Sequence, residues 1–299
     1  MDTIDERLAV IQPIDTDWYQ SKVAAIDMLR LDLLHPVISG NKWFKLRLNI
    51  RHAIDRGFKS LVTFGGGYSN HLVATACAGK MFGITTIGIV RGRYDILTPT
   101  LMQCQNAGMK LIFVTKEEYD RKEDADWIRE MASQFDELFI IPEGGANEWG
   151  RRGAGLIDRF VNASYSLVAV AVGTGTTLIG LRNSLDVRQQ LVGYVPMKQG
   201  LYLKEHIFTH LHTDKKESWQ LFDEWHFGGF GKWNTELLTF MNEFYKINNI
   251  PLDIVYTAKM MYGVRQQVLA GYFAADARIL CIHSGGLQGN VSVQGKLLY

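Results

Sequence analysis

The sequence predicts an α/β protein built on parallel sheets. Between about residues 58 and 145, short apolar runs rich in β-branched residues alternate with segments whose apolar residues recur at helical spacing, which is typical of βα units. The same succession of strand, turn and helix returns near residue 167. A length of 299 residues fits one large domain or two ordinary ones, and it allows a core without disulfide staples.

The first group of elements is a series of four strands with helices between them. The strands are expected at Ser60–Phe64, Thr85–Val90, Lys110–Thr115 and Leu138–Ile141. The helices are expected at Asn70–Phe82, Thr98–Asn106 and Arg121–Phe135. Because parallel neighbours need such crossovers, this stretch is predicted to form a compact doubly wound subdomain near residues 44–148.

A second group of elements follows residue 150. Its helices are expected at Arg152–Asn162, from Leu178 onward, around Glu236–Lys246 and at Tyr262–Ala270, and its strands at Leu167–Val172 and Arg278–His283. No linker rich in proline or serine separates the two groups. The boundary between them therefore rests on the pattern alone.

Composition excludes several classes of partner. Lysine and arginine (32) balance aspartate and glutamate (31), so the formal net charge is +1, and the charges form no blocks. Nucleic acids and membrane surfaces bind concentrated basic faces, so neither partner is expected. The three cysteines show no paired spacing, the first residues are acidic, and no apolar run approaches the ~20 residues of a membrane helix. These features predict a cytoplasmic protein.

Many of the 29 glycines cluster after predicted strands. Four clusters, Gly65–Gly67, Gly144–Gly145, Gly173–Gly175 and Gly285–Gly286, lie at strand ends or at strand–helix junctions. A tight turn explains any one of them. Because ligands of open α/β sheets bind at the carboxyl ends of strands, the shared position of all four favours a small-molecule site.

The segment VGTGTT is the best candidate for an anion site. Its glycines let backbone N–H groups point inward, Thr176 and Thr177 add hydroxyl donors, and the helix that follows offers its positive N-terminus. A dinucleotide fingerprint would need glycine where Leu178 stands and an acidic residue about 20 positions later, and a P-loop would need Lys-Ser/Thr. One phosphate therefore fits this turn better than a pyrophosphate.

Lys42 follows a Ser-Gly-Asn turn and starts a predicted amphipathic helix. A solvated surface charge is the ordinary explanation for a lysine. At a helix start, however, an ammonium opposes the helix dipole, and a lowered pKa is what an amine needs to react with an aldehyde. Lys45, one turn later, is the competing candidate.

Ser69 and Asn70 stand where a helix is expected to begin. Both residue types are favoured helix caps. The same helix start could also hold a carboxylate on its free N–H groups, with the Asn70 amide donating to a ligand. Capping and ligand binding are compatible.

Other catalytic or metal motifs have little support. His206 and His210 have the i, i+4 spacing of a metal pair, with His212 nearby, but no HExxH motif or carboxylate accompanies them, so no metal site is predicted. No G-x-S-x-G elbow or reactive-cysteine context indicates a hydrolase.

Six motifs together resemble a known family. In order they are RLDLLHPVISGNKWFKL, FGGGYSNHLVATA, IPEGGANEWG, VGTGTTLIGL, PLDIVYTAKMMYGV and IHSGGLQG, and they extend over most of the chain. The family they resemble is that of the 1-aminocyclopropane-1-carboxylate deaminases and D-cysteine desulfhydrases. It belongs to the tryptophan-synthase-β-like, fold-type II pyridoxal-phosphate enzymes.

The resemblance implies an architecture and a cofactor. It implies two open parallel-sheet domains, with pyridoxal 5'-phosphate in the cleft between them. Residues 1–43 and 149–299 would form the large cofactor-binding domain, and residues 44–148 the small inserted domain. A small amino acid would be the substrate, and the enzyme would be a homodimer.

The resemblance also assigns roles by position. Lys42 resembles the Schiff-base lysine, which also takes the α-proton of the substrate. Asn70 resembles the amide that hydrogen-bonds the cofactor's ring oxygen, and Ser69, Asn70 and His71 resemble the loop that receives the substrate carboxylate and places the Ser69 hydroxyl near the reacting carbon. Tyr256 corresponds to the family's active-site tyrosine. The residues that resemble the phosphate loop are Gly173, Thr174, Gly175, Thr176 and Thr177.

Two departures from the family pattern bear on the substrate. Thr257 stands where the deaminase branch carries a glutamate beside the pyridine nitrogen, and a hydroxyl holds a positive charge there less well. Opening a cyclopropane demands more of the cofactor than expelling a thiolate. Thr257 therefore favours activity like that of D-cysteine desulfhydrase. Phe230 is the counterpart of a tyrosine that the family often has, which would remove an acid/base hydroxyl from the substrate site.

Three interpretations follow. The first is a pyridoxal-phosphate lyase that converts D-cysteine to pyruvate, ammonia and sulfide, with 1-aminocyclopropane-1-carboxylate deaminase as the alternative activity. The second is a cofactor-binding paralogue with little activity, which the loss of the hydroxyl at Phe230 would favour. The third is a Rossmann-type nucleotide binder, against which the missing third glycine and ribose-binding acid both count.

Overall fold

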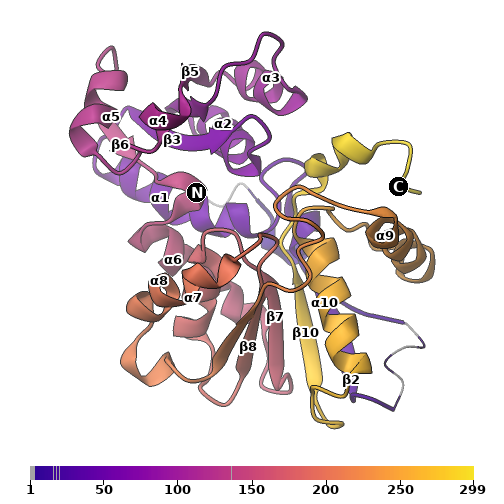
Figure 1. Ribbon diagram of the computed structural model, residues 1–299. Coiled ribbons are helices and arrows are strands. Elements are labelled where there is room, and N and C mark those ends of the chain that lie inside the picture. Colours follow the sequence, from indigo (N-terminus) through magenta and orange to yellow (C-terminus); the bar gives the residue numbers. More distant parts are fainter. Residues whose placement is uncertain (1–3, 16, 18, 20, 136) are drawn as a thin grey trace. The chain divides into compact units, whose positions relative to one another are not determined.

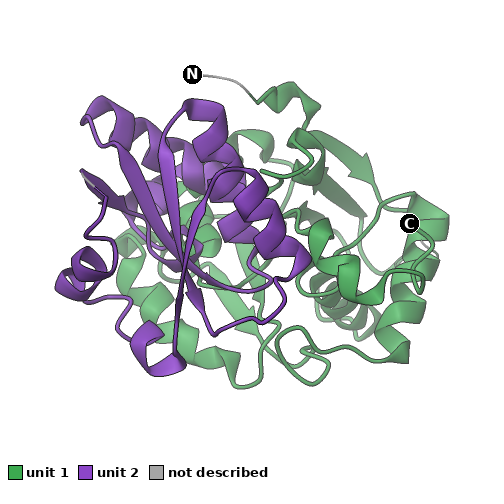
Figure 2. Cartoon of the chain, turned by 90° about the horizontal axis from the view of Figure 1, so that it is seen from above, with its two compact units in different colours: residues 1–41, 154–299 green, residues 42–153 purple. Residues whose placement is uncertain are grey.

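The computed structural model describes residues 4–15, 17, 19, 21–135 and 137–299. The chain divides into two compact units, residues 1–41 with 154–299 (unit 1) and residues 42–153 (unit 2), shown in green and purple in Figure 2. Each unit has its own sheet. None of the helices in the described ranges has the length and apolar content that crossing a bilayer demands.

Unit 2 is built on a four-stranded parallel sheet in the order β5-β4-β3-β6 (Figure 1). The strands are β3 (Ser60–Gly66), β4 (Thr85–Arg91), β5 (Lys110–Val114) and β6 (Leu138–Ile140). Its helices are α1 (Asn41–Asp55), α2 (Asn70–Phe82), α3 (Pro99–Asn106), α4 (Lys116–Tyr119), α5 (Ala125–Met131) and α6 (Glu148–Gly155). Apolar side chains of the central strands, among them Val62, Phe64 and Ile87, form its core with Trp127 of α5.

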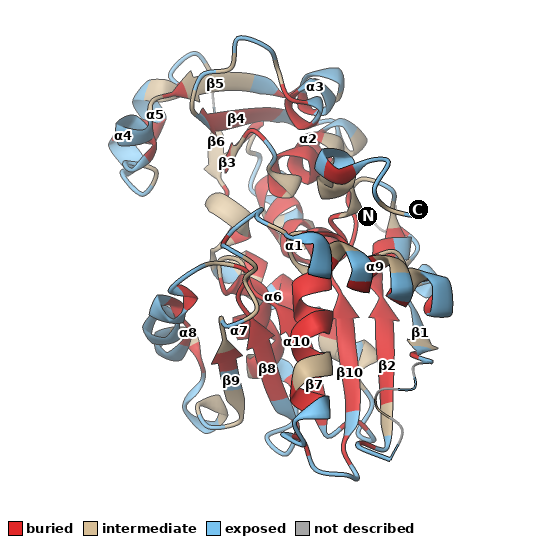
Figure 3. Ribbon diagram, turned by 45° about the vertical axis from the view of Figure 1, so that its right-hand side comes forward, coloured by how far each residue is buried: buried red, intermediate tan, exposed pale blue. Residues whose placement is uncertain are grey.

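Unit 1 is built on a six-stranded sheet in the order β1-β2-β10-β7-β8-β9. Its strands are β1 (Val10–Pro13), β2 (Ala25–Arg30), β7 (Leu167–Ala171), β8 (Gln190–Tyr194), β9 (Trp219–Phe222) and β10 (Arg278–His283). Only β1 runs antiparallel to its neighbour among the described strands. All five residues of β7 are buried, as expected of a central strand covered on both faces (Figure 3).

The helices of unit 1 are α7 (Thr176–Ser184), α8 (Leu203–His210), α9 (Thr235–Asn248) and α10 (Thr257–Leu269). Side chains of α9 and α10, including Phe240, Met241 and Val264, join Ala169 of β7 in one large core. The predicted α/β class with two parallel-sheet domains is confirmed.

Several predicted bounds are confirmed and others are wrong. The helix Asn70–Phe82 and the strand Arg278–His283 have the predicted ends. The helix predicted at Arg152–Asn162 begins earlier, at Glu148, and continues as a 3₁₀-helix over Leu156–Phe160. The helix predicted at Arg121–Phe135 is shorter because the Asp124 carboxylate accepts from the N–H groups of Asp126 and Trp127 and so caps α5.

Two helices of unit 1 begin before their predicted starts. Helix α7 begins at Thr176 rather than Leu178, directly after the left-handed Gly175. Helix α10 begins at Thr257 rather than Tyr262, because a buried aspartate upstream caps its first turn.

The segment before α1 is held by a close backbone approach. A Cβ on Gly40 would lie 1.9 Å from the carbonyl oxygen of Ser284, and a Cβ on Gly285 would lie 2.3 Å from Oγ of Ser39. Both glycines have positive φ angles, +65° and +74°. Only glycine satisfies the conformation and the spacing together, so the segment 39–41 is fixed against the end of β10.

We expect Gly40→Ala to destabilise unit 1 much more than Gly271→Ala does. Gly271 has a similar φ of +69°, but a Cβ there would meet nothing within 4 Å, so its substitution costs only the left-handed backbone, roughly 1–2 kcal/mol. The alanine at residue 40 adds a steric conflict with backbone, roughly 1–3 kcal/mol more. Denaturant unfolding of both variants measures the difference, and equal losses would contradict the close approach.

Candidate active site

The glycine-rich turn of unit 1 presents unpaired N–H groups. It joins the end of β7 to α7, and Gly175, with a φ of +82°, precedes the helix. In the described part of the chain, the amide groups of Thr176, Thr177 and Leu178 donate to no acceptor. Such a helix start, together with the glycine turn, is suited to binding an anion.

The residue before Lys42 is bonded to this turn. The side-chain amide of Asn41 donates to Oγ1 of Thr177 at 2.8 Å, and both side chains are buried. The other end of that amide, Oδ1, is buried without a hydrogen-bond partner. An orphaned polar atom at this position indicates that a further group belongs beside Thr177. Sequence reasoning did not single out Asn41.

Tyr256 and Phe230 lie beside the same turn. A Cβ on Gly173 would lie 3.5 Å from the Tyr256 ring, so the glycine leaves room for that ring. The ring of Phe230 meets the Tyr256 ring edge to face, with centroids 5.8 Å apart, and Phe230 is 56 % exposed. The predicted residues of unit 1 therefore gather in one place.

Thr257 is fully buried and bound to Asp253. The Asp253 carboxylate accepts from the N–H groups of Val255, Tyr256 and Thr257 at 2.8–3.0 Å, and from the Thr257 hydroxyl at 2.7 Å. In return, the N–H of Asp253 donates to the Thr257 hydroxyl at 2.8 Å. The Thr257 side chain is thus part of the cap of α10 as well as a candidate cofactor contact.

Unit 2 contains a buried basic cluster. Lys42, Lys45 and His71 are each less than a tenth exposed. Burial lowers the pKa of Lys45 to about 7, with a further contribution from the charge of Lys42. Burial, together with the charges of both lysines, lowers the pKa of His71 to about 3, so this imidazole is neutral.

Within the described residues, two members of the cluster, Lys45 and His71, have polar atoms without a charged partner. In the described ranges, no carboxylate pairs with Lys45, and Nδ1 of His71 is buried without a partner, while its Nε2 lies 3.0 Å from Oγ1 of Thr63. Gly145 lies against both residues, since a Cβ there would be 3.4 Å from Lys45 and 3.6 Å from His71. The buried Lys45 amine, which no carboxylate pairs with in the described ranges, is suited to an anionic ligand when protonated.

Ser69 and Asn70 have different roles at the start of α2. Ser69 is the cap: its Oγ accepts from the N–H of Leu72 at 3.3 Å. Asn70 is the first helical residue, and its half-buried amide has no partner among the residues that the structure describes. The backbone N–H groups of Asn70 and His71 also have no acceptor there, so this helix start can receive a carboxylate.

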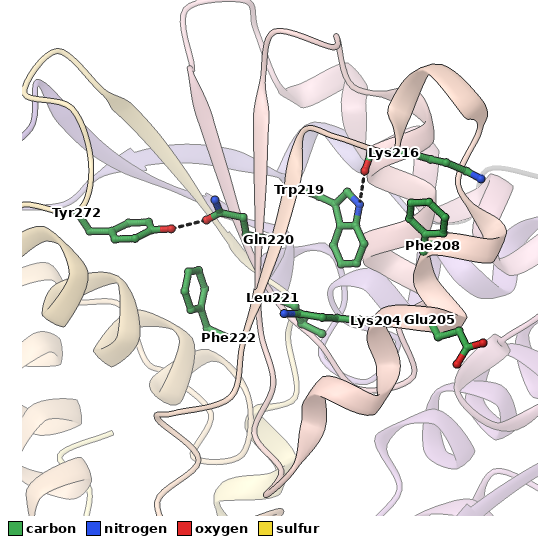
Figure 4. Close-up of a pocket in the computed structure, with 9 residues that line it drawn as sticks. All are labelled: Lys204, Glu205, Phe208, Lys216, Trp219, Gln220, Leu221, Phe222 and Tyr272. Carbon is green, nitrogen blue, oxygen red and sulfur yellow. Dashed lines mark hydrogen bonds between the residues drawn. The ribbon is translucent and has the colours of Figure 1, made fainter.

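Two other surface features stand apart from these residues. The rings of His206 and His210 lie 4.5 Å apart on α8, and the described ranges contain no group of ligands that could hold a metal ion. A groove of about 590 Å³ runs along the edge strand β9, where the Tyr272 hydroxyl donates to Gln220 at 2.6 Å (Figure 4). None of the predicted site residues lines this groove.

The chain matches a known family over most of its length. A family model described as "Pyridoxal-phosphate dependent enzyme" matches residues 27–285. The chain belongs to the pyridoxal-phosphate-dependent enzymes. The family resemblance, the enzymatic character and the cofactor predicted from the sequence are therefore confirmed.

Relatives of this pyridoxal-phosphate-dependent enzyme carry two names. A protein of Pyrococcus horikoshii named as a putative 1-aminocyclopropane-1-carboxylate deaminase is 27% identical, covering 92% of this chain and 88% of its own. A D-cysteine desulfhydrase of Klebsiella pneumoniae is 24% identical and covers 83% of both chains. A solved structure described as an ACC deaminase homologue has a TM-score of 0.82 at 25% identity, covering 97% of this chain and 93% of that one.

The residues of this pyridoxal-phosphate-dependent enzyme fit the cofactor. In unit 1, the free N–H groups at the start of α7 suit a phosphate. In unit 2, two buried lysines carry amines of the kind that reacts with an aldehyde, and the free Asn70 amide can donate to an oxygen.

The pKa of Lys45 predicts a pH dependence of the cofactor-free protein. In the unfolded chain, Lys45 keeps its proton up to its usual pKa of 10.5, whereas burial lowers the pKa in the folded protein to about 7. The unfolded state therefore binds more protons between these values, and stability falls as the pH falls from about 10 to about 7. We expect the free energy of unfolding of the wild type, relative to that of Lys45→Met, to fall as the pH is lowered from about 10 to about 7. A constant difference would contradict the burial of this ammonium.

Proposed function

We propose that this enzyme removes ammonia from a small amino acid by α,β-elimination, with D-cysteine as its substrate. The reaction consumes one water and yields pyruvate, ammonia and sulfide. When bound, the cofactor's pyridine ring withdraws electrons from the α-carbon of the amino acid. The proposal rests on the hydrogen bonds of Thr257, because they affect how strongly the pyridine ring can withdraw electrons.

The observation that carries the substrate choice is the Thr257–Asp253 pair. The Thr257 hydroxyl donates its proton to the Asp253 carboxylate and accepts the Asp253 N–H. If Thr257 lies beside the pyridine nitrogen, this neutral oxygen stabilises a protonated ring less than a glutamate would. A weaker electron sink suits a substrate with a good leaving group, such as a thiolate.

The proposed roles of the remaining residues follow from their surroundings. Lys42 would hold the cofactor through its aldehyde and would take the α-proton. Asn70 donates to the ring oxygen, and the free N–H groups at Asn70 and His71 receive the substrate carboxylate, with the Ser69 hydroxyl near the reacting carbon. Tyr256 lies beside the Gly173 turn, where its hydroxyl can hold a proton for the leaving group.

Further groups complete the proposed site. The turn of Gly173, Thr174, Gly175, Thr176 and Thr177 holds the phosphate. The buried Lys45, with a pKa lowered to about 7, is an additional group that can take up a proton beside an anion. Phe230 borders the substrate through its contact with Tyr256. We further propose that the enzyme is a cytoplasmic homodimer.

Two observations favour second candidates. Relatives named as putative 1-aminocyclopropane-1-carboxylate deaminases favour that activity as the alternative. The exposed Phe230, which has no hydroxyl, favours a cofactor-binding paralogue with little activity.

Lys42 and Lys45 are distinguished by mapping the cofactor attachment. The purified holoenzyme should absorb visible light, and borohydride reduction followed by peptide mass spectrometry should locate the phosphopyridoxyl group on Lys42. We expect Lys42→Ala to lose the visible band and at least about a thousandfold of activity, as removal of a covalent catalytic group does. The matched control, Lys45→Met, should keep the band. Label on Lys45 would overturn the assignment.

A substrate panel tests the reaction. We expect D-cysteine to release ammonia faster than L-cysteine, D-serine or 1-aminocyclopropane-1-carboxylate, with pyruvate and sulfide in equal amounts. The variant Thr257→Ser, which keeps the hydroxyl, should retain this order. Faster turnover of the cyclopropane amino acid would replace the proposal with the deaminase alternative, and no turnover by a fully loaded enzyme would favour the paralogue.

A further inference from the structure

Lys259 is a buried lysine that the proposed chemistry does not use. It is the third residue of α10, two residues after Thr257, and is only 2 % exposed. Its ammonium donates to the backbone carbonyls of His226 and Gly229, both at 2.8 Å. Burial lowers the pKa of Lys259 to about 8, and no carboxylate pairs with it in the described ranges.

The two carbonyls each start one turn of a double turn. His226 O also accepts the N–H of Gly229 at 3.0 Å, and Gly229 O accepts the N–H of Lys232 at 3.1 Å. Each carbonyl therefore begins one of two consecutive turns that span residues 226–232. The Lys259 ammonium is hydrogen-bonded to the start of both.

The double turn has one packed ring, Phe227, which meets Tyr262 of α10 edge to face at 4.9 Å, and otherwise unusual backbone. Phe227, Gly228, Gly229 and Gly231 all have positive φ angles between 50° and 125°. The three glycines contribute no side-chain packing, and their backbones have many alternative conformations in the absence of a tie. The two bonds from Lys259 add hydrogen bonds from α10 to the backbone of this segment, beside the packing of the Phe227 ring.

Phe230 of this segment contacts Tyr256. Phe230 is more than half exposed, and its edge-to-face contact with Tyr256 at 5.8 Å is the contact that links it to the candidate site. Tyr256 directly precedes α10, and the Asp253 carboxylate holds its N–H at 2.8 Å. The start of α10 thus fixes Tyr256. Lys259 of the same helix is hydrogen-bonded to the loop that contains Phe230.

We propose that Lys259 is a positioning residue that holds the double turn 226–232, so that the Phe230 ring stays against Tyr256 and limits the substrate to small side chains. This inference rests on the proposed function for its effect on the substrate. The structural tie itself does not depend on the identity of the reaction.

The first test compares Lys259→Met with Lys259→Arg in the loaded holoenzyme. Methionine removes the donors at similar length, whereas arginine keeps N–H donors for both carbonyls. We expect Lys259→Met to raise the KM for D-cysteine about tenfold, with less than a threefold change in kcat and an unchanged cofactor spectrum. Lys259→Arg should recover most of the loss. The matched control is Lys246→Met, an exposed lysine of the neighbouring helix α9, which should leave KM unchanged.

A double-variant comparison separates positioning from general stability. If Lys259 acts through Phe230, then Lys259→Met should raise KM no further once Phe230→Ala is present. A purely structural lysine would give independent, additive effects. Additive effects on KM would overturn the proposal.

Limited proteolysis tests the tie without any substrate. Lys232 is exposed at the end of the double turn, and trypsin cleaves after it only when the segment opens. We expect Lys259→Met to accelerate this cleavage at least fivefold over wild type in folded holoenzyme, as followed by mass spectrometry. If no amino acid is turned over, the proposed reaction fails while accelerated cleavage still supports the tie, and an unchanged cleavage rate overturns the tie whatever the reaction is.

Discussion

The candidate site of unit 1 depends on the backbone contact between Gly40 and Ser284. A side chain on Gly40 would lie 1.9 Å from the Ser284 carbonyl oxygen, so the two segments pack main chain to main chain. This contact places Asn41 where its amide reaches Thr177 at the start of α7. Lys42 is the next residue, and consecutive Cα atoms are about 3.8 Å apart, so the proposed attachment lysine is one peptide bond from a residue bonded to the proposed phosphate turn.

Much of the fold could be predicted from apolar runs, because central strands such as β7 and β10 are buried on both faces. Sequence reasoning missed β1, β2, β8 and β9, and of these β2 is interrupted by polar residues. β2 contains the buried polar residues Asp27 and Arg30. Arg30 pairs with the adjoining Asp32 and donates to Gln12 of β1, and Asp27 accepts from the Tyr165 hydroxyl, 138 residues away. Partners so distant in sequence leave no periodic pattern. The early start of α10 has the same kind of cause, since the capping carboxylate lies four residues upstream.

Parts of the candidate site could be predicted where the residue type and its place at a helix start are enough to indicate ligand binding, as for Ser69, Asn70 and the glycine turn. Lys45 and Lys259 show what the sequence does not reveal. In sequence, each is an ordinary lysine on an amphipathic helix. Burial changes the first into an amine with a pKa near 7, and two loop carbonyls give the second a structural partner. Both properties come from tertiary packing, which no local pattern encodes.

The acid–base balance of the proposed site depends on how the buried Asp253 carboxylate is used. Asp253 accepts four hydrogen bonds, three from backbone N–H groups and one from the Thr257 hydroxyl, which is about the full capacity of a carboxylate. Its charge is therefore engaged in capping α10. What Thr257 can present to a ligand is one remaining lone pair on a neutral oxygen. A pyridine nitrogen there would gain a weak acceptor rather than a counter-ion, so bond cleavage must depend more on the leaving group than on the ring.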